Sequence, residues 1–342
     1  MGEIKIKAPT KEDTVTAILK STFPPNIPKN QYNQKMSKKN TENNPLVTIS
    51  IPSYKPDFFE QSLRSALGQT YQNIEIYVSD NCKTEDIFHI CNKYPQVNYK
   101  RNQNMGSKNV IDSFFLGKGI YIKPLFDDDI LHPFCVEYMV KAMQSDPDAS
   151  LCFSSRSFIN KHNIIIGNNI PFPENKKLPG DFIKKSITLN ADNYIGEFST
   201  IMFPRKILGQ ENRYELFDYN NESFIKGLTD VIFFIKTTSN SNAIYLNDIL
   251  SYFRKDISLT SNSNPLHNPD FILAVTNWMD IIINLHKNME ISDEEILSTT
   301  QKITDITKIW IHSHPEIIQN FEKYLEYIRT ILTKNAYPKN NI

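Results

Sequence analysis

Cysteine is scarce in this sequence of 342 residues. No two of its cysteines form a CxxC pair or a metal-finger spacing, and in a chain this long they are expected to be free thiols of a reducing compartment. The four are Cys82, Cys91, Cys135 and Cys152. An excess of one charge is absent too, because Lys+Arg and Asp+Glu both number 38. We therefore expect a cytoplasmic protein with no overall field that attracts nucleic acid or an acidic membrane surface.

Long apolar runs are also missing. No stretch approaches the roughly 18–20 apolar residues of a membrane span. Residues 1–7 lack the apolar core of a signal peptide. Hydrophobic residues make up 40% and charged residues 22% of the chain, the balance of a globular protein that buries a core. Peripheral contact with a membrane stays open.

The composition divides the chain into three regions. Residues 1–44 are polar and predict a partly flexible arm with one short helix over 12–20. Residues 45–265 contain the alternating strands and helices of a main domain. Residues 266–342 have helical apolar spacing and end in a tail that is expected to fray.

Short β-branched runs alternate with helical patterns in the first half of the main domain. Such alternation predicts an α/β fold with an open, mostly parallel sheet flanked by helices. In such sheets ligands bind beyond the carboxyl ends of the strands, so the residues that follow the strands should converge on one crevice. The expected strands cover 46–51, 74–78, 97–100 and 120–126, and the expected helices begin at Asp57, surround 87–91 and cover 106–117.

The later part of the chain has a mixed pattern and then a helical one. Short strands are expected at 150–154, 164–166 and 201–203, strand ends at 244–246 and 250–254, and a helix over 230–236. Three further helices are expected over 271–285, 296–311 and 317–332, and they form a C-terminal helical extension.

The most informative stretch is 121–131, an apolar run that ends in Asp127, Asp128 and Asp129. Three adjacent carboxylates repel one another, and a divalent cation would neutralise them. Mg²⁺ and Mn²⁺ take oxygen ligands and often bridge one or two carboxylates to a substrate's phosphates. The alternative is a solvated acidic turn that caps the helix starting near His132.

Five segments together resemble the family 2 glycosyltransferases, a large group of inverting enzymes with the GT-A fold. Each segment is common by itself, but their order and spacing are specific, and the firm resemblance covers about residues 45–140. The segments are Leu46-Val-Thr-Ile-Ser-Ile-Pro-Ser-Tyr54, Ser65-Ala-Leu-Gly-Gln-Thr-Tyr71, Ile76-Tyr-Val-Ser-Asp-Asn81, Asn104-Met-Gly106 and Phe126-Asp-Asp-Asp-Ile-Leu131.

The resemblance implies a site for a nucleotide-diphosphate sugar, with a UDP-sugar as the expected donor. Residues 45–140 would form the nucleotide-binding half of the domain and 141–265 the acceptor half. Asp80 would accept a hydrogen bond from the base, and Asp127 would contact ribose or a metal-bound water. The full donor-binding set implied is Pro52, Ser53, Tyr54, Asp80, Asn104, Gly106, Lys108, Asp127 and Arg254, with Arg101 a further candidate for the diphosphate.

The same resemblance implies a metal, Mn²⁺ or Mg²⁺, that acts as a Lewis acid on the leaving nucleoside diphosphate. Asp128 is its first expected ligand, and Asp129 and Asp256 are further candidates. The chain departs from the family pattern at Phe126, where the motif's first Asp is usual, and at Asp256, where His is usual.

Inverting transfer needs a carboxylate that takes the proton of the acceptor hydroxyl. The resemblance places this general base at Asp230, with Asp218 and Glu222 as competitors. A structural alternative is that Asp230 only caps the helix that follows. Residues Glu197, Ser199 and Thr200 would border the sugar or the acceptor.

The leading hypothesis is thus a metal-dependent inverting glycosyltransferase of the hexosyltransferase type, acting on a glycan, a glycolipid or a protein. Its place would be in polysaccharide biosynthesis. One alternative is a non-catalytic sugar-nucleotide-binding or scaffold protein of the same fold, since Phe126 and Asp256 depart from the pattern. A nucleotidyltransferase ranks last, because no Gly-rich phosphate loop follows the first strand. The C-terminal helices are a candidate interface for a homo-oligomer.

Overall fold

The computed structural model describes residues 44–209, 213–219, 222–255 and 271–336. The expected helix over 12–20, Asp256 and residues 337–342 lie outside the described residues. The described chain forms two compact units, and each consists of several chain segments. The first unit takes 44–177, 195–209, 213 and 243–255, and the second takes 178–194, 214–219, 222–242 and 271–336.

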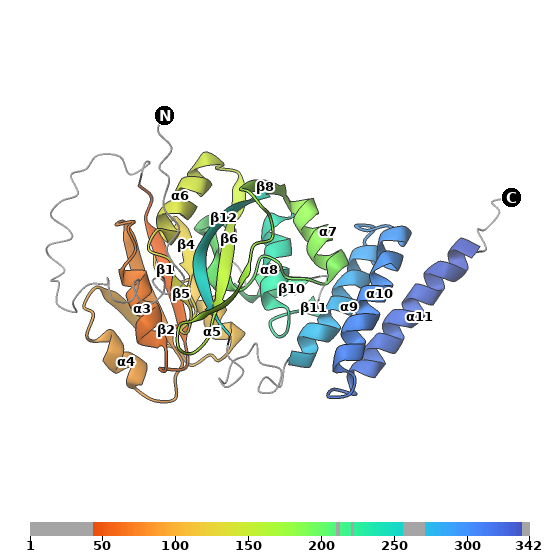
Figure 1. Ribbon diagram of the computed structural model, residues 1–342, viewed down its shortest axis with the longest axis horizontal. Coiled ribbons are helices and arrows are strands. Elements are labelled where there is room, and N and C mark those ends of the chain that lie inside the picture. The colour runs from red at the N-terminus through yellow and green to blue at the C-terminus, as the bar shows by residue number, and fades with distance from the viewer. Residues whose placement is uncertain (1–43, 210–212, 220–221, 256–270, 337–342) are drawn as a thin grey trace. The chain divides into compact units, whose positions relative to one another are not determined.

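Within the described residues, the first unit is built on a ten-stranded mixed sheet (Figure 1). Eight strands form the main path, with β7 beside β6 and β8 beside β12. In spatial order the strands are β3 (Val97–Arg101), β2 (Ile74–Asp80), β1 (Val47–Ser53), β4 (Tyr121–Pro124), β9 (Ile201–Pro204), β6 (Ala149–Ile159), β12 (Asn242–Arg254) and β5 (Ile130–Leu131), with β7 (Ile165–Asn169) and β8 (Lys176–Pro179) off this path.

The parallel part of the sheet is its N-terminal half. β1 pairs in parallel with both β2 and β4, and β2 pairs in parallel with β3. β9 then pairs antiparallel with β4 and with β6. The expected α/β fold with a helix-flanked sheet is confirmed, and the antiparallel pairs lie on the later half of the chain.

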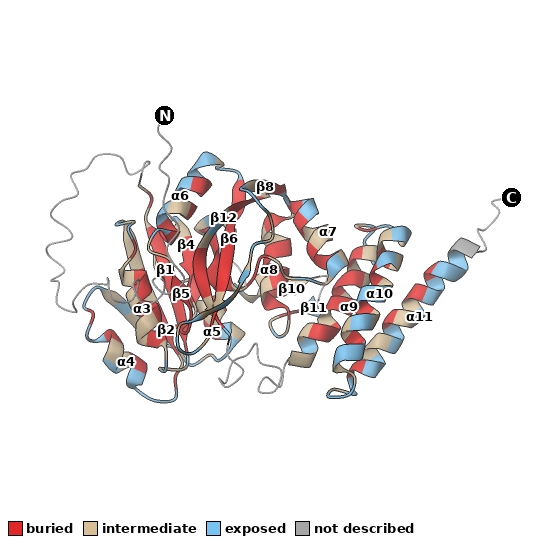
Figure 2. Ribbon diagram, viewed as in Figure 1, coloured by how far each residue is buried: buried red, intermediate tan, exposed pale blue. Residues whose placement is uncertain are grey.

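Side chains alternate along β1 because the strand has a period of two. Val47, Ile49 and Ile51 belong to a buried cluster with residues of α3 (Phe59–Leu67) and α6 (Cys135–Ser145). Ser50 points the other way and donates to Ser113 Oγ of α5 (Ser107–Phe114), 2.8 Å away. Helices therefore cover both faces of the sheet, which explains why β1 is buried along its whole length (Figure 2).

The remaining short elements of the first unit connect strands. They are α4 (Asp86–Cys91) and the 3₁₀ turns η1 (Phe198–Thr200) and η2 (Arg205–Ile207). The four cysteines are all buried and unpaired, so the expected free thiols are confirmed.

Helices dominate the second unit. α7 contacts α8, α9 and α10, and α9 contacts both α10 and α11. A capping box starts α10, because Ser292 accepts from the Glu295 N–H and Glu295 accepts from the Ser292 N–H. The elements are α7 (Gly180–Asn190), η3 (Arg213–Phe217), a β10–β11 pair (Asp218–Tyr219, Glu222–Ser223), α8 (Thr229–Thr238), α9 (Phe271–Lys287), α10 (Asp293–Trp310) and α11 (Ile317–Ala336).

The three expected C-terminal helices are confirmed, with bounds that differ by a few residues. Helix α7 was not expected, because its apolar signal consists mainly of Ile183 and Ile187, one turn apart. The strand ends expected at 244–246 and 250–254 both lie in a single strand, β12. No helix in the described part of the chain is long and apolar enough to cross a membrane.

Candidate active site

Three strand ends meet at one edge of the sheet. In the parallel register, Ser53 at the end of β1 lies opposite Asp80 at the end of β2. Beyond β4, Asp127 Oδ2 accepts a hydrogen bond from the backbone N–H of Tyr54, 2.8 Å away. The expected convergence of the segments that follow β1, β2 and β4 is therefore confirmed.

The acidic triplet, Asp127 to Asp129, gives each carboxylate a different partner. Asp127 Oδ2 also accepts from the backbone N–H of Lys55 at 3.1 Å. Asp128 Oδ2 lies 2.5 Å from the Lys55 ammonium. Asp129 Oδ1 accepts from the backbone N–H of Arg254 at 3.0 Å. The triplet is thus tied to the end of β1 and to the end of β12.

Burial dominates the electrostatics of the triplet. Desolvation, and then the negative charge of Asp128, raise the pKa of both Asp127 and Asp129 above the usual range for Asp. For Lys55, burial alone would lower the pKa, but the charges of Asp128 and Asp127 outweigh it and raise the pKa above its ordinary value. Ionisation of these carboxylates therefore costs the folded state free energy, and a bound cation would reduce that cost.

Sequence reasoning missed Lys55. Its side chain is only 14% exposed and pairs with an Asp128 side chain that is 12% exposed. Its ammonium also lies 5.2 Å from the centre of the Tyr54 ring. A signal was present in the sequence, because a lysine two residues after a strand end shares the carboxyl edge with the acidic triplet.

The Asp80 carboxylate is buried and fully engaged. Its Oδ1 accepts from the Cys82 N–H at 2.7 Å, and its Oδ2 accepts from the Tyr99 hydroxyl at 2.7 Å. The Arg101 guanidinium lies 2.7 Å from Oδ2 and is 39% exposed, whereas the Asp80 side chain is not exposed. Arg101 therefore lies on the solvent side of the carboxylate expected to bind the base. Of the other donor candidates, Pro52 and Ser53 at the end of β1 are buried, and Tyr54, directly after β1, is exposed.

The Asn104–Gly106 loop leads from β3 into α5. Gly106 has a φ of 57°, a conformation that favours glycine, and it occupies the N-cap position of α5. Asn104 Nδ2 donates to Asp112 Oδ2 at 2.6 Å, which fastens the loop to that helix. Lys108, in the first turn of α5, is exposed.

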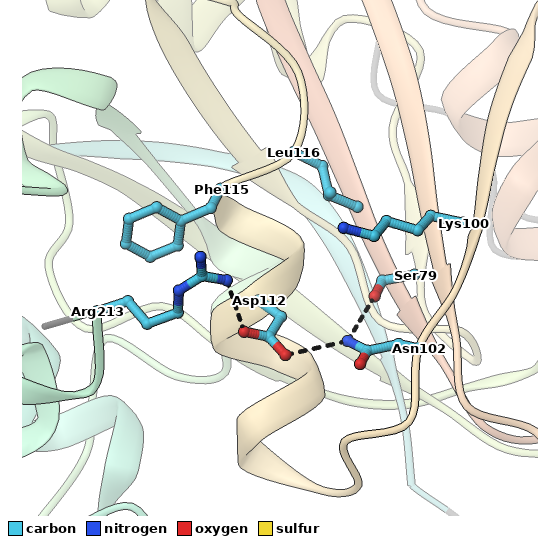
Figure 3. A pocket seen from close by; sticks show the side chains of 7 residues that line it. All are labelled: Ser79, Lys100, Asn102, Asp112, Phe115, Leu116 and Arg213. Carbon is cyan, nitrogen blue, oxygen red and sulfur yellow. Dashed lines mark hydrogen bonds and ion pairs between the residues drawn. The ribbon is translucent and has the colours of Figure 1, made fainter. Parts of the chain in front are cut away.

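A small cavity of about 130 Å³ lies beside α5 (Figure 3). Arg213 Nη1 lies 2.9 Å from Asp112 Oδ1, and its guanidinium lies 4.8 Å from the centre of the Phe115 ring. Burial would raise the pKa of Asp112, but hydrogen bonds from Asn104 and Asn102 and the pair with Arg213 lower it. The described residues that line this cavity include none of the expected donor-binding residues; they are Ser79, Lys100, Asn102, Asp112, Phe115, Leu116 and Arg213.

Arg254 is buried beneath the acidic triplet. Its guanidinium donates to Asp128 O at 2.9 Å and to Asn160 O at 2.8 Å. It also lies 4.0 Å from the centre of the Phe58 ring. In this arrangement Arg254 supports the main chain of the triplet, and its expected contact with the diphosphate stays a prediction.

The segment that holds Glu197, Ser199 and Thr200 lies directly against the start of the triplet. Ser199 Oγ accepts from the Phe126 N–H at 2.9 Å, and Ser199 O accepts from the buried Lys123 ammonium at 2.5 Å. Glu197 forms an ion pair of 3.2 Å with Arg156. Phe126, the departure from the family pattern, places its ring 6.2 Å from that of Phe198, at right angles to it.

Asp230, the expected base, lies in the second unit, in the first turn of α8. It is partly exposed, and its Oδ2 accepts from Asn193 Nδ2 at 2.8 Å. Its competitors Asp218 and Glu222 lie on the β10–β11 pair of the same unit.

The donor set of the triplet fits a shared metal rather than a closed protein cage. Among the described residues, no three His, Cys, Asp or Glu side chains are arranged to hold a metal ion. Mg²⁺ and similar hard cations are often held by one or two carboxylates together with substrate phosphates and water. Asp128, with Asp129 next to it, provides oxygen ligands of that kind. Asp256, the third expected ligand, lies outside the described residues.

Residues 48–209 match the family model described as "Glycosyl transferase family 2". The chain is 30% identical over 138 residues to a chondroitin synthase of Pasteurella multocida (strain Pm70). This match covers 38% of this chain and 14% of that protein. It is 31% identical over 128 residues to UDP-Glc:alpha-D-GlcNAc-diphosphoundecaprenol beta-1,3-glucosyltransferase WfaP of Escherichia coli. This match covers 36% of this chain and 50% of that protein. The matches thus span half or less of these curated relatives.

Among solved structures, residues 1–349 of S. aureus TarS have a similar fold. The TM-score is 0.57 at 14% identity, over 83% of this chain and 81% of that chain. TarS 1–349 in complex with UDP-GlcNAc aligns with a TM-score of 0.55 at 13% identity and the same coverage. The resemblance expected from the five sequence segments is confirmed: residues 48–209 of this chain match the model of glycosyl transferase family 2, and the fold is GT-A.

Proposed function

We propose that this protein is a metal-dependent inverting glycosyltransferase that moves a sugar from a UDP-sugar to a hydroxyl group of a glycan, glycolipid or protein acceptor. The observation that carries the proposal is the meeting of Tyr54, Asp80 and the acidic triplet at the carboxyl edge of the sheet. Ligands of open α/β sheets bind at this edge. The UDP-sugar is supported by the UDP-Glc in the name of the E. coli relative and by the UDP-GlcNAc complex of TarS.

The residues of the first unit would bind and orient the donor. Asp80 would accept a hydrogen bond from a base N–H in place of the partly exposed Arg101 guanidinium. Tyr54, which directly follows the residue opposite Asp80, has an exposed side chain that could pack against the base. Asp127, whose Oδ2 accepts from two backbone N–H groups, would contact ribose or a metal-bound water. Asn104, Gly106 and Lys108 would border the donor from the loop before α5.

Asp128 and Asp129 would hold Mn²⁺ or Mg²⁺, with Asp256 as the further expected ligand. When bound, the metal supplies Lewis-acid stabilisation of the leaving diphosphate. Arg254 would keep the triplet's main chain in place from below, because its guanidinium donates to Asp128 O. The buried Lys123 would do the same for the segment before the triplet.

Asp230 is the proposed general base, which accepts the proton of the acceptor hydroxyl as that oxygen attacks the sugar. Its support is the family resemblance and its place in the first turn of α8. Partial exposure leaves the carboxylate accessible to a substrate. The hydrogen bond from Asn193 would fix the direction of one carboxylate oxygen.

The experiment is transfer and hydrolysis of a panel of nucleotide sugars by the purified chain with Mn²⁺. Binding is measured separately by thermal unfolding with each nucleotide sugar, with and without Mn²⁺. A ligand at 100 times its Kd stabilises the folded protein by about 2.7 kcal/mol. Turnover of at least one donor is expected. Binding without any turnover would favour the non-catalytic sugar-nucleotide-binding protein.

Asp230→Asn tests the base. The variant should keep nucleotide binding, because its amide replaces a carboxylate outside the donor-binding unit, and should lose transfer by at least about 100-fold. Asp305→Asn, an exposed substitution on α10, is the matched control and should keep activity. Asp218→Asn decides between the competitors: a loss of transfer there, with Asp230→Asn active, would move the role to Asp218.

A further inference from the structure

The Lys55 ammonium lies against the carboxylate of Asp128, the first expected metal ligand. Its Nζ lies 2.5 Å from Asp128 Oδ2, and both side chains are mostly buried. The pair is therefore screened less by salt than a pair on the open surface. A metal that binds this oxygen must share it with the ammonium or displace the ammonium.

The main chain places Lys55 at this position. The backbone N–H groups of Tyr54 and Lys55 both donate to Asp127 Oδ2, at 2.8 and 3.1 Å. These bonds fix the backbone of Lys55 beside the triplet. Its ammonium is therefore within reach of Asp128. The pairing is thus built into the turn that follows β1.

The neighbouring cationic side chains have another use. The Arg254 guanidinium donates to the carbonyl oxygens of Asp128 and Asn160. The Lys123 ammonium donates to the carbonyl oxygens of Pro124 and Ser199. These bonds support the main chain around the triplet, whereas Lys55 directly contacts a carboxylate of the triplet.

We propose that Lys55 is a resident cation of this site and that Lys55 and a divalent cation compete for the Asp128 carboxylate. The proposal rests on the proposed metal-dependent function. Lysine suits the role because its compact ammonium is carried by a flexible four-carbon chain that can turn away. Lys55 is a positioning residue here: its ammonium balances the charge of Asp128 when no metal is bound.

Competition makes metal binding depend on the nucleotide. The metal alone must displace Lys55, but a bound diphosphate offers oxygen ligands to the metal and a second anionic partner to the displaced ammonium. Metal and nucleotide should therefore strengthen each other's binding, and this coupling is reciprocal. Removal of the Lys55 charge should strengthen binding of the metal alone and weaken the coupling.

The first test measures Mn²⁺ binding alone by titration calorimetry, in full-length wild type, Lys55→Met and Lys55→Gln. Both variants should bind Mn²⁺ about 5- to 150-fold more tightly than wild type, the usual range of a coupling between sites. Lys55→Arg retains a cation and should stay near wild type. Lys141→Met, which removes the same charge from an exposed position on α6, should have no effect.

A double variant identifies the carboxylate. Lys55→Met with Asp128→Asn should lose the tight Mn²⁺ binding that Lys55→Met gains. Equal Mn²⁺ affinity in wild type and Lys55→Met, or no Mn²⁺ binding by Lys55→Met, would overturn the competition. In either case, turnover of a donor in the nucleotide-sugar panel would leave the glycosyltransferase function in place, so the two failures can be told apart.

The second test uses the wild-type protein and needs no substitution. Acetic anhydride labels accessible lysines, and mass spectrometry follows the modified fraction of Lys55 and of Lys141. Saturating MnCl₂ should increase labelling of Lys55, because the ammonium leaves Asp128, and leave labelling of Lys141 unchanged. Labelling of Lys55 that Mn²⁺ does not change would contradict the proposal.

Discussion

Asp127, Asp128 and Asp129 are chemically identical, yet their surroundings make them different groups. Asp127 accepts two backbone N–H bonds, Asp128 contacts an ammonium, and Asp129 is fully buried. Burial and a like charge next to it both disfavour an ionised carboxylate. The folded protein therefore keeps this arrangement at a cost in stability, as is common for groups selected for function.

Asp129→Asn should stabilise the ligand-free protein. Burial, followed by the charge of Asp128, raises the pKa of Asp129, so its ionised form costs the folded state free energy at any pH above the ordinary Asp value of about 3.9. The amide removes the charge and keeps an oxygen for the Arg254 N–H. We expect the free energy of unfolding at pH 8 to rise by about 1–2 kcal/mol.

Urea unfolding of wild type and variant from pH 8 to pH 4 checks this prediction. The difference between them should shrink as the pH falls through the folded-state pKa of Asp129, because wild type then loses the same charge by protonation. Asp57→Asn, at an exposed position before α3, is the control. A less stable Asp129→Asn at pH 8 would show that the carboxylate makes a net favourable interaction.

Single residues also show where sequence reasoning succeeded. Asp80 and the triplet were predicted to meet because both follow strands of a parallel sheet, and the strand register brings their segments together. Lys55 was missed, because its position two residues after β1 indicates only that it shares the carboxyl edge, and not that its side chain reaches a carboxylate 73 positions along the chain. Long-range ion pairs of this kind exist only in the folded chain.

At the scale of elements, the turn before η1 shows how a backbone conformation supports the site. Gly196 has a φ of 101°, and a Cβ there would lie 2.0 Å from Arg156 Nη1. The same guanidinium pairs with Glu197. Two residues further on, Ser199 accepts from the Phe126 N–H, directly before the triplet. The absence of a side chain at Gly196 thus allows this segment to pack against the triplet.

Gly196→Ala should destabilise the first unit by about 2–4 kcal/mol, because it combines a strained φ with a steric clash. Thermal and urea unfolding measure the loss. Gly209→Ala is the matched control, since a Cβ there meets nothing within 4 Å and the backbone is not left-handed. Equal effects of the two substitutions would exclude a special role of the Gly196 conformation.

Elements were predicted well where the apolar pattern was strong. The parallel strands and the three C-terminal helices carry clear periods of two and 3.6, and their positions agree with the structure. Helix α7 was missed, because Gly180 at its start and few buried apolar residues hide the signal. Its glycine has a tertiary cause: a Cβ at position 180 would lie 1.7 Å from Thr238 O.

At the scale of the whole molecule, the chain contributes to each compact unit through several segments. The expected base Asp230 belongs to the second unit, with the C-terminal helices, whereas the donor-binding candidates that the structure describes belong to the first. Within the second unit, polar contacts connect segments that are distant in the sequence. Glu290 accepts from Lys184 of α7 at 2.6 Å and from the Tyr219 hydroxyl of β10 at 2.8 Å.

Glu290→Gln should weaken the second unit in a pH-dependent way. Burial alone would raise the pKa of Glu290, but hydrogen bonds from Lys184 and Tyr219 outweigh it and lower the pKa. A depressed carboxylate pKa contributes stability above the unfolded value of about 4.3, and the contribution is lost as the pH falls through the folded value. The variant should lose about 1 kcal/mol at pH 7.

Urea unfolding followed at pH 7, 5 and 3.5 tests this expectation. The gap between wild type and Glu290→Gln should narrow as the pH falls through the lowered folded-state pKa of Glu290, because wild type then also becomes protonated. Glu326→Gln, exposed on α11, should match wild type throughout. A gap that stays constant with pH would mean that the ionised carboxylate is not the source of the stability.

The sequence by itself determined the resemblance to the family, the alternation of strands and helices and the strand-end position of the candidate residues, because these depend on local apolar periods and short motifs. Only the tertiary structure decided the partners of those residues: Lys55 on Asp128, Arg101 on Asp80 and the buried Arg254 beneath the triplet. These contacts join residues far apart in the chain. Their strength depends on burial, which no local pattern contains.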